Sequence, residues 1–494
     1  MLRFPSIFQA CLVLLIAAML AGCDDSPEVE TNENPFLSVK VNIAVPAGHD
    51  FAEPWGVALD EWMAITHASV ELTEYTLEAG KPLSQSWPED VVPDVILFPT
   101  YRAAELDEAG LLAAMPVEVR KDEDLAWLDY FDGVRKYVTP LQRSPAIVPA
   151  GTPVLTCYYR QDLFKAAELS PPSTWTEYQE LVTTVGDWGN GLPVVEPWSE
   201  SFRASMFLAR SASVVKHSGF FSTLFDIETG APLIATRGYQ KTLNDVVTNL
   251  HKLPPEVLSY SPADCRRLIL SGKAAMAITM ETGEGNPDLY FASSSSEQTD
   301  KQEWTRSNSI NIGFCPLPGS EEAFNRSTSE FEAPLSGDIN RVSLTGFAGL
   351  SMGVTVSEDN VKRAAAWNLL VTLISEPTYS TVFTSGRRQL CRSSQAEAPS
   401  MWVGVNLEDD EAQAYVAAVQ NSLRGTQVIK ELPVIGADQF RAALTAGISK
   451  ALSKEAAPAE ALSEIDQAWA AISKEVGVDK VRNSYRRSLG LTNK

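Results

Sequence analysis

The sequence is poor in the residues that bind polyanions or metal ions. Lys and Arg number 40 against 63 Asp and Glu, which gives a formal net charge of -23. This balance opposes binding to nucleic acid or to anionic lipid through a basic face. The four His never lie one helix turn apart, and the six Cys include no C-x-x-C pair. We therefore expect no metal site, and nothing in the sequence implies a cofactor.

Catalytic and nucleotide-binding motifs are also missing. Gly272-Lys273 is followed by Ala274 and has no Gly five residues earlier, so it is not a phosphate-binding loop. The sequence contains no G-x-S-x-G, H-E-x-x-H or G-x-G-x-x-G motif. These absences favour a binding protein over an enzyme. A glycosidase with two carboxylates stays open as an alternative, because such residues need not be close in sequence.

The sequence has a single long apolar run, and it lies at the N-terminus. Residues 10–22 are 13 consecutive apolar or small residues, fewer than the roughly 18–20 that span a bilayer. Residues 1–22 are therefore expected to be a signal peptide. Leu20-Ala21-Gly22-Cys23 resembles the lipobox of bacterial lipoproteins, which predicts a lipid on Cys23 and a flexible tether over residues 23–37. The alternative is an ordinary cleaved signal that contains a cysteine.

The remaining sequence alternates between strand and helix patterns. Residues 39–46 alternate with period two and precede a helical pattern that carries Leu59 and Trp62. Residues 91–98 form an almost continuous apolar run of the kind found in buried parallel strands, and Leu106 lies in the helix pattern that follows. This alternation predicts an α/β fold with parallel, doubly wound sheets.

Helix boundaries are signalled clearly in the second half of the sequence. Thr174 and Glu177 form a capping box, and Ser261 precedes a Pro at the first position of another helix. Two amphipathic helices are expected near the C-terminus, separated at Pro458. Residues 283–308 and 320–339 have the composition of surface insertions.

Several segments together resemble one family. Residues 153–164 (PVLTCYYRQDLF) and 169–177 (LSPPSTWTE) resemble a segment of carbohydrate-type extracellular solute-binding proteins, the maltose-binding-protein-like group. Shorter matches in the same order are DVIL at 94–97, GKAAM at 272–276 and PLPG at 316–319. Arg160 departs from the family pattern, which usually has Asn at this point.

The resemblance implies two doubly wound α/β lobes that are joined by a hinge and enclose a ligand cleft. The first lobe would comprise residues 38–150 and 316–383. The second would comprise residues 151–315 and 384–480, with residues 481–494 as a tail. It also implies that Cys157 and Cys315 lie on adjacent strands, where they would form either a disulfide or two buried thiols.

For function, the resemblance implies a lipid-anchored solute-binding subunit of an ATP-driven importer. Such a subunit is exported to the outer side of the cytoplasmic membrane, in the periplasm or at the cell surface. It would act as a monomer, capture a small solute, most often a sugar in this family, and deliver it to an ABC permease coupled to an ATPase. It would not be an enzyme. The alternatives are a surface glycosidase and a ligand-sensing module for a membrane receptor.

Ligands of open α/β sheets bind at the carboxyl ends of strands, and this rule selects the candidate ligand-binding residues. Three expected loops contribute Trp55, Tyr101, Glu196, Trp198 and Glu200. Glu196-Pro197-Trp198 also resembles the family segment that carries an aromatic platform for a sugar. Glu281 follows the GKAAM strand. The alternative for each aromatic is a packing role. In the same loops, His49 is expected to be a plain loop residue and Arg102 an exposed cation.

Overall fold

The computed structural model describes residues 34–47, 52–78, 80–89, 91–135, 146–281, 305–307, 309–335, 337–378, 390–399, 407–424 and 427–491. From Phe36 onward, these residues belong to one compact unit. The expected signal peptide, Cys23, His49 and nearly all of the expected insertion at 283–308 lie outside the described residues.

The first sheet has five strands in the order β2-β1-β3-β12-β4. The strands are β1 (Lys40–Pro46), β2 (Ser69–Tyr75), β3 (Val95–Pro99), β4 (Val148–Pro149) and β12 (Leu350–Val354). β1 is parallel to both β2 and β3, whereas β12 is antiparallel to β3 and β4. The sheet is therefore mixed. Its antiparallel strand β12 comes from a distant part of the chain.

Both faces of this sheet are buried, as the apolar run at 91–98 predicts. Val95 and Leu97 belong to one hydrophobic cluster, and Ile96 and Phe98 belong to another. This alternation follows from the period of two along a strand. Helices α1 (Ala52–Thr66) and α10 (Asn360–Ile374) contact each other and pack with the first cluster.

The second sheet has four strands in the order β6-β7-β5-β8. The strands are β5 (Thr156–Arg160), β6 (Val194–Val195), β7 (Met276–Thr279) and β8 (Ile312–Pro316). β6 and β7 are parallel, and β5 is antiparallel to both β7 and β8. The chain passes from the first sheet into the second between β4 and β5, and it returns between β8 and β12. These crossings explain why each sheet contains antiparallel pairs within a fold that is otherwise α/β.

Helices surround the second sheet, and the predicted capping box at Thr174 and the predicted helix start at Ser261 are both confirmed. Thr174 caps α5 (Trp175–Thr183) and accepts from the Glu177 N–H, and Ser261 caps α9 (Pro262–Leu270) in the same way. The other helices between β5 and β8 are α4 (Gln161–Ala166), α6 (Val185–Trp188), α7 (Arg203–Val215) and α8 (Arg237–Leu250). Shorter described helices elsewhere are α2 (Ala103–Glu108), α3 (Val117–Arg120) and α12 (Ser393–Glu397).

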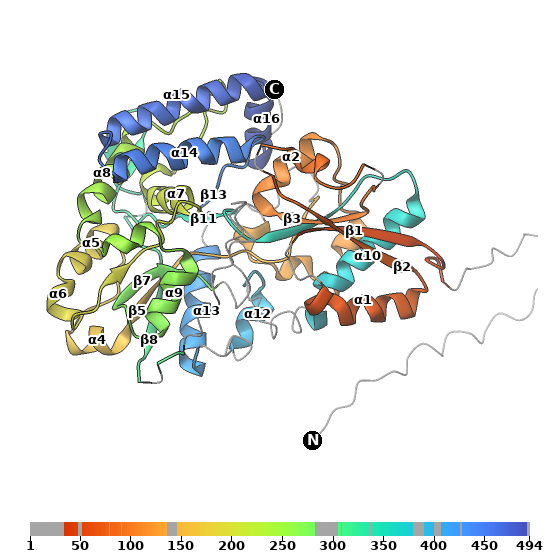
Figure 1. Cartoon of the computed structure of the whole chain (residues 1–494), viewed down its shortest axis with the longest axis horizontal. Coiled ribbons are helices and arrows are strands. Elements are labelled where there is room, and N and C mark those ends of the chain that lie inside the picture. Colours follow the sequence, from red (N-terminus) through yellow and green to blue (C-terminus); the bar gives the residue numbers. More distant parts are fainter. Residues whose placement is uncertain are drawn as a thin grey trace, which may run out of the picture. The chain divides into compact units, whose positions relative to one another are not determined.

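The C-terminal region contains the two long helices that the sequence predicts. Helices α14 (Ala437–Leu452) and α15 (Pro458–Val476) pack against each other and contact α7 and α8 (Figure 1). Before them come α13 (Asp409–Leu423) and the short strand β13 (Val428–Lys430), which pairs in parallel with β11 (Ser343–Thr345). The β11–β13 pair thus joins segments that lie more than 80 residues apart in sequence.

Two further segments have structure of their own. Within the expected insertion at 320–339, β9 (Ala323–Asn325) and β10 (Glu330–Glu332) form an antiparallel pair. Helix α16 (Val478–Ser488) covers much of the segment that we expected to be a tail. Its Tyr485 is buried, and the Tyr485 hydroxyl accepts hydrogen bonds from the backbone N–H groups of Thr223 and Leu224 at 3.0 and 3.1 Å.

Candidate functional site

A pocket lies where the carboxyl end of β3 meets the ends of β11 and β13. Its volume is about 340 Å³, with open solvent at its mouth included. Three separate stretches of chain form its wall, one at the end of each of these strands. The lining residues are Thr100, Tyr101, Ala103, Ala104, Gly346, Lys430, Glu431 and Pro433. We refer to this pocket as the candidate site.

The first wall is held in place by hydrogen bonds to Gly349 and to Ser351 of β12. β3 ends at Pro99 and continues into the short 3-10 helix η2 (Thr100–Arg102), which leads into α2. The Thr100 backbone N–H donates to the Gly349 carbonyl at 3.1 Å, and the Thr100 hydroxyl lies 2.9 Å from the Ser351 hydroxyl. Gly346 has a φ of 74°, a left-handed conformation that favours glycine at this point of the wall.

Arg102 lies behind this wall and is 1% exposed. The expectation that Arg102 is an exposed cation is therefore wrong. Its guanidinium donates to Asp438 at 2.5 Å, to Glu105 at 2.9 Å and to the Lys81 carbonyl at 2.7 Å. Burial lowers the pKa of Arg102, but the charges of Glu105 and Asp438 outweigh it and raise that pKa above its ordinary value. The two carboxylates make burial of this cation tolerable.

Tyr101 is covered by a cation from α14. The guanidinium carbon of Arg441 lies 4.5 Å from the centroid of the Tyr101 ring, within the range of a cation–π interaction. Arg441 also forms an ion pair with Glu431 at 3.1 Å, and Glu431 accepts a hydrogen bond from the Ser205 hydroxyl at 2.8 Å. Burial raises the pKa of Tyr101 to about 12 and also raises the pKa of Glu431, which Arg441 opposes.

Lys430 is the last residue of β13, and unlike Glu431 and Arg441 it has no charged partner among the described residues. Its side chain lines the candidate site and is partly buried, and the loss of solvation lowers the pKa of Lys430 to about 7. Its ammonium forms no hydrogen bond or ion pair with any residue that the structure describes. Sequence reasoning missed Lys430, Glu431 and Arg441. The one available signal was a Lys-Glu pair after the apolar Val428 and Ile429, but a three-residue strand is too short to recognise by its pattern.

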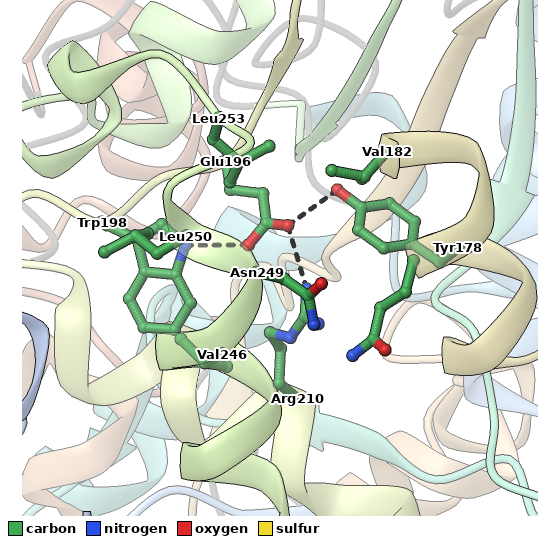
Figure 2. A pocket seen from close by; sticks show the side chains of 10 residues that line it. Tyr178, Val182, Glu196, Trp198, Arg210, Val246, Asn249, Leu250 and Leu253 are labelled. Atoms are coloured by element: carbon green, nitrogen blue, oxygen red, sulfur yellow. Dashed lines mark hydrogen bonds and ion pairs between the residues drawn. The ribbon is translucent and has the colours of Figure 1, made fainter. Parts of the chain in front are cut away.

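Glu196 and Trp198 line a second hollow of about 270 Å³, together with residues of α5, α7 and α8 (Figure 2). The Trp198 indole N–H donates to Glu196 at 2.8 Å, and the Tyr178 hydroxyl and the Arg210 guanidinium each donate to the other carboxylate oxygen at 2.9 Å. Trp198 is fully buried and Glu196 is 3% exposed. In this conformation the indole therefore offers no open face for a sugar to stack on, and its role as a platform stays a prediction.

The other three predicted ligand-binding residues line neither hollow. Trp55 is buried, and its indole N–H donates to the Leu373 carbonyl of α10 at 2.9 Å. Glu281 is buried in a two-pronged ion pair with Arg266, at 2.8 and 2.9 Å. Glu200 is exposed. Of the six predicted residues, the structure thus brings together Glu196 and Trp198 in one hollow and places Tyr101 in the candidate site.

The described residues contain neither a cluster of metal-binding side chains nor a helix that could span a membrane. No group of three or more His, Cys, Asp or Glu side chains in this part of the chain is arranged to hold a metal ion. None of the described helices has both the length and the apolar character to span a bilayer.

Two sheets linked by crossing segments, with a pocket between segments from distant parts of the sequence, define a two-lobe binding protein. Residues 79–376 match the family model described as bacterial extracellular solute-binding protein. This match spans more than half of the sequence, and the chain belongs to this family. The resemblance seen in the sequence is thereby confirmed. No curated protein matches the chain.

Solved structures show the same two-lobe α/β fold. Maltose-bound T. maritima MalE3 is 16% identical with a TM-score of 0.58, and the match covers 88% of this chain and 100% of that one. The sugar-binding protein MalE from Xanthomonas citri is 15% identical with a TM-score of 0.64, over 89% and 99%. A solute-binding protein of an ABC transporter from Agrobacterium radiobacter K84, in complex with ribitol, is 16% identical with a TM-score of 0.59, over 90% and 100%.

Proposed function

We propose that the protein is the solute-binding subunit of an ATP-driven importer and that it captures a sugar or polyol in the candidate site. Family membership supports solute binding, and solved structures of the same fold hold maltose, ribitol and D-mannitol. We choose this site because the ends of β3, β11 and β13 converge on one pocket. Carboxyl ends of strands are where α/β sheets bind ligands.

The chemistry of the lining suits a sugar or polyol. Ala103, Ala104 and Pro433 offer apolar surface for the C–H groups of the solute. Thr100 offers a hydroxyl oxygen and Lys430 an ammonium that can hydrogen-bond to its hydroxyl groups. An apolar wall with a few placed polar groups is the usual composition of a small-molecule site.

The proposed lobes divide this lining between them. Residues 100–104 and Gly346 fall in the first proposed lobe, at 38–150 and 316–383. Residues 430–433 fall in the second, at 151–315 and 384–480. A solute that contacts both groups favours the conformer in which the lobes are closed, so binding shifts the population toward the form that a permease would recognise.

Membrane attachment is a further part of the proposal. We propose that residues 1–22 direct export and that Cys23 carries a lipid, with residues 23–37 as the tether. The protein would then be held on the outer side of the cytoplasmic membrane, next to the permease. Cys23→Ser should abolish metabolic labelling by a radioactive fatty acid. Cys11→Ser is the matched control, because Cys11 lies within the expected signal peptide. Unchanged labelling of Cys23→Ser would refute the anchor.

Solute binding is tested by thermal shift and calorimetry. The mature chain would be titrated with maltose, ribitol, D-mannitol and D-tagatose, and a ligand that binds only the folded form raises the melting temperature by mass action. Tyr101→Ala removes one wall of the candidate site and should weaken binding by about 1–3 kcal/mol. Tyr260→Ala, on a partly exposed Tyr that lines neither hollow, is the matched control. Equal weakening by both variants would contradict the assignment of the site.

A further inference from the structure

Helix α16 is anchored to the second proposed lobe by buried contacts. The Tyr485 hydroxyl accepts hydrogen bonds from the backbone N–H groups of Thr223 and Leu224. The next residue, Arg486, donates to the Ile227 carbonyl at 2.9 Å. Tyr485 and Arg486 are both buried. The loop that they contact belongs to the second proposed lobe, so α16 moves with that lobe.

The residue after these two, Arg487, contacts the first proposed lobe instead. Its Nε atom donates to the Asp107 carboxylate at 2.8 Å, and its Nη2 atom donates to the Glu108 carboxylate at 2.7 Å. Asp107 and Glu108 are the last two residues of α2, and α16 and α2 contact each other (Figure 1). Three consecutive side chains of one helix therefore connect the two proposed lobes.

The local chemistry of α2 does not explain two carboxylates at this point. They lie in the last turn of the helix, which contains no basic residue. A carboxylate there faces the negative end of the helix dipole, which is unfavourable. Arg487 offsets this repulsion from a position 380 residues beyond Asp107 in the sequence.

The Arg487–Asp107 pair is also better shielded from water than an ordinary surface ion pair. The side chains of Asp107 and Arg487 are 3% and 16% exposed, whereas that of Glu108 is 32% exposed. Attraction between charges is stronger in such surroundings, and separating the pair takes this cation away from a buried carboxylate. The partial exposure of Glu108 and Arg487 still leaves the contact sensitive to salt.

Two more contacts between the proposed lobes lie beside the candidate site. Arg102 precedes α2 and donates to Asp438 at 2.5 Å, and Arg441 lies over the Tyr101 ring. Asp438 and Arg441 belong to α14, in the second proposed lobe. Contacts between the lobes thus extend from the wall of the candidate site to the end of α2 that Arg487 holds.

We infer that α16 is an interlobe strap, in which Tyr485 and Arg486 fix the helix to one lobe and Arg487 ties it to the other. Lobes that move apart at the candidate site carry α2 away from α16, so opening breaks both Arg487 ion pairs. The strap therefore favours the closed conformer before any solute binds. Less of the binding energy is then spent on closing the lobes, which raises the affinity for the solute. This last consequence rests on the proposed function.

The test measures the separation of the lobes in unliganded protein. Small-angle X-ray scattering would be recorded for the mature wild type, for Arg487→Met, and for the double variant Asp107→Asn with Glu108→Gln, which removes the same ion pairs from the α2 side. Arg482→Met is the matched control, because Arg482 lies on α16 and forms its ion pair with Asp479 of the same helix. Melting of each variant confirms that it is folded.

Two salt concentrations separate the ionic contribution from the rest. Scattering at about 0.01 M and about 1 M NaCl, extrapolated to zero protein concentration, compares Debye lengths of about 30 Å and about 3 Å. The wild type and Arg482→Met should have a smaller radius of gyration at low salt than at high salt. Arg487→Met and the double variant should have the larger radius at both concentrations. Combining the two sets of changes should expand the protein no further than either set alone, because both remove the same contacts.

The same variants connect the strap to solute binding. A solute among maltose, ribitol, D-mannitol and D-tagatose that binds the wild type should bind Arg487→Met about 2- to 10-fold more weakly, and should bind Arg482→Met as tightly as the wild type. An unchanged radius of gyration in Arg487→Met, or an equal expansion in Arg482→Met, would overturn the inference. Expansion confined to the strap variants supports it even if none of these solutes binds, and that lack of binding would count against the proposed function alone.

Discussion

Cys157 and Cys315 lie directly opposite each other on the antiparallel strands β5 and β8. Both are free thiols in this structure; Cys157 is fully buried and Cys315 is partly exposed. A hydrogen bond to Cys315 and burial raise the pKa of Cys157 well above its ordinary value. Directly opposed residues of antiparallel strands have Cα atoms about 4.5–5.5 Å apart, within the range that a disulfide spans. The adjacency implied by the family resemblance is thus confirmed.

We predict that these two thiols form a disulfide in an oxidising compartment. In chain exported to such a compartment and purified without reductant, two of the four thiols at 157, 265, 315 and 391 should react after denaturation, and all four should react once reductant is added. The bridge should add about 2–4 kcal/mol to the free energy of unfolding, because it closes a long loop in the unfolded chain. Urea unfolding with and without reductant measures this gain. Four reactive thiols in both conditions would show that no bridge forms.

Trp198 provides a second prediction, because its burial separates a packing role from a binding role. Trp198→Ala should lower the free energy of unfolding by about 3–5 kcal/mol, since it leaves a large cavity and removes one donor from Glu196. Trp198→Phe keeps most of the ring and should cost less. Urea unfolding of both variants measures the effect. A Trp198→Ala variant that is as stable as the wild type but loses solute binding would restore the platform role.

Trp198 and Tyr101 show how far the sequence could take the prediction. The sequence placed both at the carboxyl ends of strands, and this local rule depends only on strand pattern. Both side chains are buried, and their burial depends on packing by segments far away in sequence. α7 and α8 contribute lining residues around Trp198, whereas Tyr101 meets Arg441, more than 300 residues later. A single sequence contains no record of that contact.

Other features were predictable for local reasons. The capping box at Thr174 and the helix start at Ser261 depend on residues within one turn of each other, so both were correctly predicted. Arg102 was wrongly expected to be exposed, because one of its partners, Asp438, is distant in sequence. The same reason explains why the Lys430 side of the candidate site was missed entirely.

The third prediction tests whether Glu281 stabilises the fold or binds the ligand. Its carboxylate is buried, receives two hydrogen bonds from Arg266 and accepts a third from the Tyr158 hydroxyl at 3.1 Å. Glu281→Gln should therefore destabilise the fold by about 3–5 kcal/mol, because it leaves the Arg266 charge buried and unpaired. The double variant Glu281→Gln with Arg266→Met should recover part of this loss, as measured by urea unfolding. Solute affinity of the folded variants should be unchanged, and a loss of affinity in both would assign Glu281 to the ligand after all.

Lys430 makes the stability of the unliganded protein depend on pH in a defined direction. Its pKa is about 7 in the folded chain, against an ordinary value of 10.5, because burial disfavours the charged form. Between these two values the unfolded chain binds more protons than the folded chain, so this residue makes the fold less stable as the pH falls from about 10.5 to 7. Well below pH 7 Lys430 is protonated in both states, and its contribution no longer changes with pH.

Lys430→Met removes this penalty, and its stability advantage over the wild type should therefore grow as the pH falls. We expect the advantage to increase by about 2–3 kcal/mol between pH 9.5 and pH 7, and to level off below about pH 6, because one pKa unit corresponds to about 1.4 kcal/mol. Urea unfolding at half-unit pH steps measures it, with Lys474→Met as the exposed control that should show no such trend. An advantage that is independent of pH would mean that Lys430 keeps its ordinary pKa in the folded chain.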